Sequence, residues 1–191
     1  MFERCHVVTK NLKEMNEQEF WKIIDRSAVE SKLDTSLQSN IITEMLDSYT
    51  IEQMIEFEII FRQLVIAADD FKILGAQKII DGYVSDDSYL YFRCWLIGLG
   101  ESTFREALQN PDILADVVHE GTVADFEELM YVTTTAFLKK TGKEEEDDSC
   151  PRAIALYKGY DYDFNTPPTK GTDWTEDQLP VLYPRLWAKF H

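Results

Sequence analysis

The strongest constraint on the fold is the stretch of residues 85–100, SDDSYLYFRCWLIGLG, which is apolar on almost every side of a helix. Ser85 is a good N-cap residue, and the two glycines near the end of the stretch are helix-ending signals. A helix that is hydrophobic all round is buried, so we predict that this segment lies in a protein core. Its charged residues need partners there, because an unpaired buried charge is costly. These residues are Asp86, Asp87 and Arg93.

The rest of the chain carries start and stop signals for a series of helices. Asn16 with Glu19, and Thr50 with Gln53, form capping patterns ahead of apolar runs. From caps, apolar periodicity and turn residues we predict helices from residue 16 onward and over residues 36–48, 50–68, 71–80, 85–100, 102–108 and 122–140, with a short final helix from residue 184. Residues 153–157 are the best candidate for a strand. The pattern predicts a mainly α, single-domain multi-helix bundle.

The character of the sequence changes along the chain and suggests four parts within one domain. Residues 1–14 are a leader or appendage, and residues 15–142 form the helical core. Residues 143–150 are an acidic loop, for which simple solvent exposure is the plainest interpretation. Residues 151–191 are rich in aromatic residues and turn signals. So many aromatic side chains are expected to fold back on the core rather than form a free tail.

The charge of the chain restricts its partners. Thirty-five acidic residues against nineteen basic ones give a net charge of −16 over 191 residues. Such a surface repels phosphate backbones, so we expect no direct nucleic-acid binding. It attracts a basic protein partner and speeds its capture, although solubility alone also explains the charge.

Export and membrane signals are missing from the sequence. No apolar window has the length of a signal-peptide core or of a membrane span, so we expect a cytoplasmic protein without membrane association. The three cysteines are an odd number at wide spacing, which predicts no disulfide framework. The oligomeric state cannot be predicted from these features.

Four charged residues fall on helix faces that otherwise require burial. Glu58 and Arg62 are four residues apart on the apolar side of the helix 50–68, and Asp86 and Arg93 are two turns apart on the next apolar helix. We therefore predict one interior polar cluster of Glu58, Arg62, Asp86 and Arg93, joined by Asp87. The favoured interpretation is a structural tether between helices. The alternative is a pocket that binds an anionic ligand through the two arginines.

The sequence lacks the residue combinations and spacings of known catalytic sites. The three histidines lack metal-ligand spacing, and no glycine-rich phosphate loop follows a predicted strand. We expect no catalytic residue set, no metal and no cofactor, and we lean toward a protein that is not an enzyme.

Several motifs point to one family. Residues 15–21 (MNEQEFW), the stretch 82–100, the block 110–115 (NPDILA) and the closing residues 182–186 (LYPRL) occur in the chain. Together they resemble the uncharacterised bacterial domain-of-unknown-function family 4240, over about residues 15–191. The resemblance implies a small stand-alone bacterial protein with an accessory or protective role, and it brings no catalytic residues with it.

We therefore expect a non-enzymatic cytoplasmic binding or regulatory protein, such as an immunity protein that neutralises a basic protein partner. The expected contact surface combines five acids with two aromatic anchors that we take to be exposed, namely Glu144, Glu145, Glu146, Asp147, Asp148, Tyr160 and Tyr162. The alternative is a ligand sensor or enzyme that uses an Arg62/Arg93 anion pocket. An open cavity beside Arg93 would favour this alternative.

Overall fold

The backbone is helical almost throughout. The computed structural model describes residues 14–163 and 166–191, so the predicted leader falls almost wholly outside the described residues. Within these ranges there is no strand, only an isolated bridge between Asp70 and Lys170. The mainly α prediction is thereby confirmed. The longer helices are α1 (Glu17–Ser31), α2 (Thr35–Leu46), α3 (Ile51–Ala67), α4 (Phe71–Asp81), α5 (Asp86–Gly98), α6 (Glu101–Gln109) and α7 (Val132–Thr141).

Shorter elements complete the body. They are the 3₁₀ helices η1 (Pro111–Asp116), η2 (Glu127–Tyr131) and η3 (Glu176–Gln178), and the short helices α8 (Pro151–Tyr157), α9 (Leu179–Leu182) and α10 (Pro184–Phe190). Two sequence-based predictions are wrong here. Residues 122–140 are not one helix, because a loop runs to Phe126 before η2 and α7. The proposed strand at 153–157 is helix α8, which begins at Pro151, a residue well suited to the first helical position.

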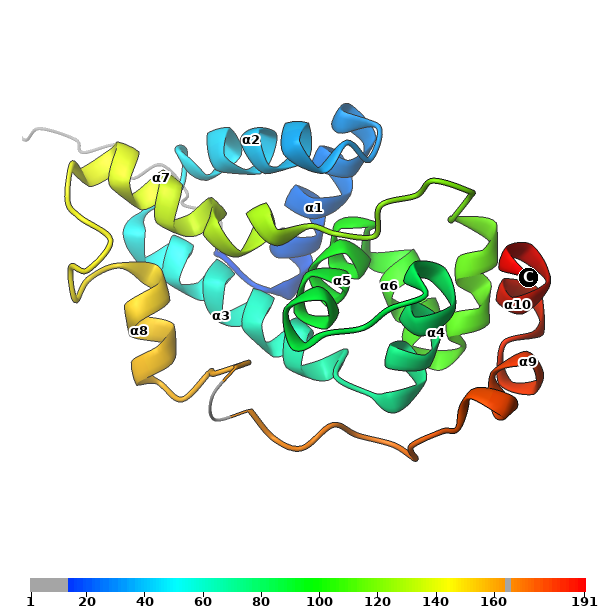
Figure 1. Cartoon of the computed structure of the whole chain (residues 1–191). Coiled ribbons are helices and arrows are strands. Elements are labelled where there is room, and N and C mark those ends of the chain that lie inside the picture. The colour runs from blue at the N-terminus through cyan, green and yellow to red at the C-terminus, as the bar shows by residue number, and fades with distance from the viewer. Residues whose placement is uncertain (1–13, 164–165) are drawn as a thin grey trace, which may run out of the picture.

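Helix α5 lies at the centre of the fold, as its composition predicts. It packs against α1, α3, α4, α6 and η2 (Figure 1). Its buried positions include Phe92, Cys94, Leu96 and Ile97, all with no exposed surface. At its end, Gly98 leaves room for the ring of Phe126, whose two nearest carbon atoms lie 2.6 and 2.9 Å from where a Cβ would be.

Three of the capping signals in the sequence mark helix starts correctly, those at Asn16, Thr50 and Ser85. Asn16 accepts a hydrogen bond from the backbone of Glu19, and Thr50 and Gln53 form a full capping box. Ser85 and Ser88 form the same reciprocal pair at the start of α5. Each pair satisfies backbone N–H groups that the first helical turn leaves free.

The C-terminal segment packs along one side of the helical body, as predicted. In Figure 1 residues 166–191 run in orange and red along the lower edge and up the right side to α10, which packs against α4. Tyr162, Leu179, Tyr183 and Leu186 join the hydrophobic core. Lys170 also ties the junction of α3 and α4, because its backbone bonds to that of Asp69 and of Phe71.

Two motifs that are far apart in the sequence meet in space. The carboxylate of Asp112, in the 110–115 block, accepts the backbone N–H groups of Arg185 and Leu186 at 2.9–3.1 Å, at the start of α10. The Tyr183 hydroxyl donates to the carbonyl of Lys72 at 2.9 Å and passes over Gly75, where any Cβ would lie 2.4 Å from it. The 110–115 and 182–186 motifs thus dock α10 onto η1 and α4.

Candidate functional site

A buried ion pair joins two turns of α3. The Nε of Arg62 donates to Oε1 of Glu58 at 2.6 Å, and both side chains are about 1% exposed. The other carboxylate oxygen of Glu58 accepts from the Thr133 hydroxyl of α7 at 2.6 Å. Removing both charges from water costs free energy, and these two short hydrogen bonds offset that cost. The predicted pairing of Glu58 with Arg62 is therefore present in the fold.

The C-terminal segment covers this ion pair on its outer side. Nη1 of Arg62 donates to the carbonyl of Tyr160 at 2.9 Å, and the ring of Tyr162 stacks 4.5 Å from the guanidinium carbon. Burial is the main cause that raises the pKa of the Tyr162 hydroxyl. Tyr162 was predicted as an exposed anchor, and this is wrong, because it is 4% exposed. Stacking on a guanidinium gives a buried tyrosine ring a partner that the sequence does not reveal.

Arg93 is also buried, but its acidic partner is Asp69 at the end of α3. Nη1 of Arg93 lies 3.7 Å from Oδ2 of Asp69 and 3.3 Å from the carbonyl of Val65. The guanidinium stacks over the ring of Tyr89, whose hydroxyl bonds to the backbone of Asp70. Arg93 thus ties α5 to the junction between α3 and α4.

A pocket of about 230 Å³ opens beside Arg93, and we call it the Arg93 pocket. It lies between the α3–α4 junction, the first turns of α5 and the C-terminal segment. Its walls are mostly polar side chains, and they include four aspartates against one arginine. The lining residues are Asp69, Asp86, Asp87, Tyr89, Leu90, Arg93, Tyr162, Asp163, Thr166 and Thr169.

The predicted single cluster therefore divides into two groups. Asp86 and Asp87 share the pocket with Arg93 but are exposed at its edge, where the first turn of α5 favours negative charge. Arg62 does not line this pocket, so the two arginines do not form the anion pocket considered from the sequence. The acidic partner that the sequence did not reveal is Asp69, which lies between the end of α3 and the start of α4.

The acidic loop leaves four carboxylates on the surface. Glu144, Glu145, Glu146 and Asp148 are exposed. Asp147 instead organises the loop, because it accepts from the backbone and hydroxyl of Ser149 and pairs with Lys143. These hydrogen bonds lower the pKa of Asp147 to about 2.

Tyr157 is an exposed aromatic residue near this loop, whereas Tyr162 is buried. Tyr157 is 93% exposed at the end of α8, next to the partly exposed Leu156, whereas Tyr160 is half-buried. An ion pair of 3.7 Å between Lys158 and Glu56 places this end of α8 against α3.

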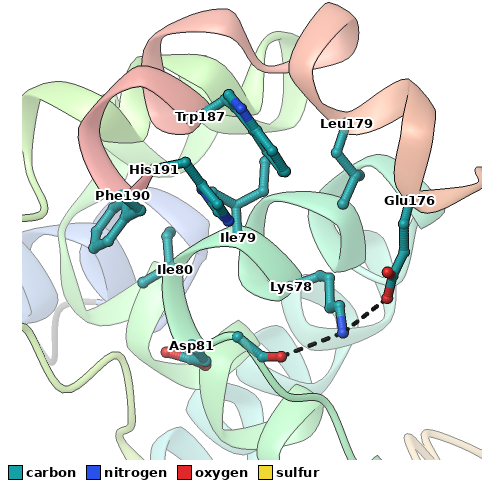
Figure 2. Close-up of a pocket in the computed structure, with 10 residues that line it drawn as sticks. Lys78, Ile79, Ile80, Asp81, Glu176, Leu179, Trp187, Phe190 and His191 are labelled. Atoms are coloured by element: carbon teal, nitrogen blue, oxygen red, sulfur yellow. Dashed lines mark hydrogen bonds and ion pairs between the residues drawn. The ribbon is translucent and has the colours of Figure 1, made fainter.

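A second pocket, of about 450 Å³, lies between α4 and the C-terminal helices. Figure 2 shows Trp187, His191 and Leu179 over Ile79, with the Lys78–Glu176 ion pair at one side. The rings of Trp187 and His191 stack at 3.7 Å. Its walls combine apolar side chains with an ion pair whose two charges compensate each other, so they select no particular class of ligand.

The described residues form no metal site. Over residues 14–163 and 166–191, no three His, Cys, Asp or Glu side chains gather in a way that could hold a metal ion. Cys94 and Cys150 are buried and free, and burial raises the pKa of the Cys94 thiol. Among the helices of residues 14–163 and 166–191, none is long and apolar enough to cross a membrane.

Comparison with known proteins identifies the family. The sequence model described as "Protein of unknown function (DUF4240)" matches residues 15–139, well over half of the chain. The chain belongs to this family. No curated protein and no solved structure matches it significantly.

The DUF4240 match contains both buried arginines and their acidic partners. It ends in α7, before the acidic loop, so the similarity that we noted at residues 182–186 lies beyond it. The Arg93 pocket is therefore built from both regions. Asp69, Asp86, Asp87 and Arg93 come from the DUF4240 part, and Tyr162, Asp163, Thr166 and Thr169 come from the segment that follows.

Proposed function

We propose that this protein acts by binding a basic protein partner, as an immunity-type or regulatory protein does, rather than by catalysis. The observation that carries the proposal is that four exposed carboxylates of the loop and an almost fully exposed tyrosine stand at the two ends of one short helix, α8. We call this surface the acidic face. It comprises Glu56, Glu144, Glu145, Glu146, Asp148, Leu156 and Tyr157.

The dimensions suit a single interface. Helix α8 begins directly after the loop and has seven residues, so the loop and Tyr157 are separated by about 10 Å. A standard protein interface buries about 800 Å² on each partner, which easily covers this distance. Tyrosine is enriched among the residues that dominate binding energy, whereas charges at a rim mostly raise the association rate. The acidic face offers both contributions.

The net charge of −16 supports the same choice of partner. A potential of this sign speeds the approach of a basic protein and slows that of another acidic one. A net charge of this size can also serve solubility alone. The test must therefore separate a local effect of the acidic face from the effect of the total charge.

The experiment compares two variants with the same total charge. The first neutralises the exposed loop acids and leaves Asp147 in place, because Asp147 holds the loop together: Glu144→Gln, Glu145→Gln, Glu146→Gln and Asp148→Asn. The second neutralises four exposed acids elsewhere: Glu106→Gln, Glu120→Gln, Glu128→Gln and Asp173→Asn. The partner is first identified by affinity capture and cross-linking and is then purified.

Association and dissociation rates are measured over a salt series. The loop variant should associate about tenfold more slowly at low salt, with the difference disappearing at high salt. The scattered variant should lose much less. Tyr157→Ala should mainly speed dissociation, because the anchor is lost. Equal association rates for the two charge variants, or a captured partner that is not basic, would remove the acidic face from the mechanism.

A further inference from the structure

A groove of about 500 Å³ opens on the exposed side of α9, and we call it the α9 groove. It is lined by residues 172–174, 177–178 and 181–182, which include the apolar side chains of Trp174, Val181 and Leu182. Val181 is 82% exposed and Leu182 is 51% exposed, whereas Leu179 on the same short helix is buried in the core. Apolar side chains that stay uncovered together around one cavity are typical of an interaction site.

The walls of the α9 groove are held in place by the fold. The indole N–H of Trp174 donates to the carbonyl of Phe71 at 2.7 Å, which fixes this half-buried ring against the start of α4. Thr175 and Gln178 form a capping box across η3, the turn that leads into α9. A groove that is already formed loses little conformational freedom when it binds, and this favours affinity.

The ionisable side chains of the α9 groove are two aspartates. Oδ1 of Asp173 accepts the backbone N–H of Trp174 at 2.8 Å, and Oδ1 of Asp177 accepts from the hydroxyl of Thr175 at 2.5 Å. Both carboxylates are exposed, and in the part of the chain that the structure describes neither takes part in an ion pair. Apolar walls with two uncompensated negative charges match a partner that is both apolar and basic, and they repel an anionic one.

We propose that the α9 groove docks a peptide segment of another protein, in which an aliphatic side chain lies next to a lysine or an arginine. The aliphatic side chain packs against Trp174, Val181 and Leu182, and the cation pairs with Asp173 and Asp177. The volume falls within the range of small-ligand pockets, roughly 300–1,000 Å³, so the groove suits a short segment rather than a folded domain. In Figure 1, α9 lies on the right and α8 on the left, so this groove is separate from the acidic face.

The test uses the full chain labelled with ¹⁵N and follows its amide signals by NMR. The probe is the peptide acetyl-Gly-Lys-Leu-Lys-Gly-amide, titrated at constant ionic strength. Three control peptides change one property each: glycine replaces the leucine, glutamine replaces both lysines, or glutamate replaces both lysines. We expect saturable shifts with the probe, confined to amides of residues 172–182 and of the start of α4.

The controls separate the apolar contribution from the charge. The glycine peptide should bind about tenfold more weakly, because it lacks the side chain that the groove buries. The glutamine peptide should bind roughly three- to tenfold more weakly at low salt, with a smaller difference at high salt. The glutamate peptide should cause no saturable shift.

Variants locate the site on the chain. Val181→Ser removes part of the apolar wall and should weaken binding of the probe roughly fivefold. Val29→Ser is the matched control, because Val29 is 78% exposed on α1, and it should leave the affinity unchanged. Asp177→Asn keeps the oxygen that accepts from Thr175 but removes the charge, so it should weaken binding about threefold at low salt.

The two charge variants of the partner experiment distinguish this proposal from the acidic face. The scattered variant contains Asp173→Asn and should bind the probe more weakly, whereas the loop variant, with the same total charge, should bind it as the unaltered protein does. For the partner of the acidic face, the loop variant is the one that should be impaired. Either proposal can therefore fail while the other holds.

Several results would overturn the α9 groove as a docking site. These are no saturable shifts with the probe, equal affinity for the glycine or the glutamate peptide, shifts centred on the acidic loop, or unchanged affinity in both Val181→Ser and Asp177→Asn. Shifts of the same amides that depend on protein concentration alone would also overturn it, because a second copy of this chain would then be the occupant.

Discussion

Replacing Glu58 by glutamine should destabilise this protein far more than a similar change on its surface. Glutamine keeps the shape of the side chain but removes the charge that compensates Arg62, which is buried and has one nitrogen, Nη2, without any hydrogen-bond partner in the described residues. Breaking a buried ion pair on one side costs about 3–5 kcal/mol. For a chain of this size, 1 kcal/mol shifts Tm by about 2–4 °C, so we expect a decrease of roughly 6–20 °C.

The chain provides a matched control. Arg26 and Glu30 form the same contact four residues apart on α1, Nε to Oε1 at 2.7 Å, but their side chains are 65% and 43% exposed. Glu30→Gln should cost less than about 1 kcal/mol, because water screens the pair. Urea unfolding, followed by circular dichroism, gives both free energies of unfolding.

A double variant tests whether charge imbalance is the cause. Glu58→Leu with Arg62→Met replaces both charges by apolar side chains of similar size, and this should recover most of the stability lost in Glu58→Gln. A loss in Glu58→Gln no larger than in Glu30→Gln, or a double variant less stable than the single one, would refute the reasoning.

Three further predictions concern other parts of the fold. Arg93→Ala should lower the free energy of unfolding by about 3 kcal/mol. Arg93→Lys should be almost as unstable, because lysine lacks the planar guanidinium that stacks on the ring of Tyr89. Thermal unfolding of both variants measures these losses. Gly75→Ala should lower the free energy of unfolding by about 1–3 kcal/mol, because the added methyl group displaces Tyr183. The expected readouts are a lower Tm and stronger quenching of the fluorescence of the C-terminal tryptophans. The pKa of Tyr49 is raised to about 12 by burial and by its hydrogen bond to a glutamate, so its contribution to stability is present below about pH 10 and is lost as pH rises toward 12. Tyr49→Phe should show less of this alkaline loss in pH-dependent unfolding.

Local signals were enough to predict most helices. The caps at Asn16, Thr50 and Ser85 depend on residues only three positions away, and the structure contains all of them. The all-round apolar pattern of α5 also predicted its central place. Where the prediction failed, distant residues decide the outcome. Phe126 lies in a loop because its ring enters the space above Gly98 and its N–H bonds to the carbonyl of Tyr91.

The candidate site was predictable only in part. Glu58 and Arg62 are on one helix, so their spacing reveals the pair. Asp69 follows the end of α3, and nothing in its neighbours shows that α5 brings an arginine to it. Tyr162 looks like one of many tail aromatics, and its burial results from the guanidinium of Arg62 beneath its ring. Contacts between segments that are far apart in the sequence leave no periodic trace in it.

The docking of α10 on η1 has a consequence for how the protein is made. As the chain leaves the ribosome, α3, α4 and η1 emerge first, with the Asp112 carboxylate and the surface over Gly75 still uncovered. Their partners, Tyr183 and the start of α10, are synthesised some seventy residues after Asp112. Contacts so distant in sequence form late, so the nascent helices wait with apolar surface exposed. The interval before α10 arrives is therefore when apolar surface of this chain is most open to wrong contacts.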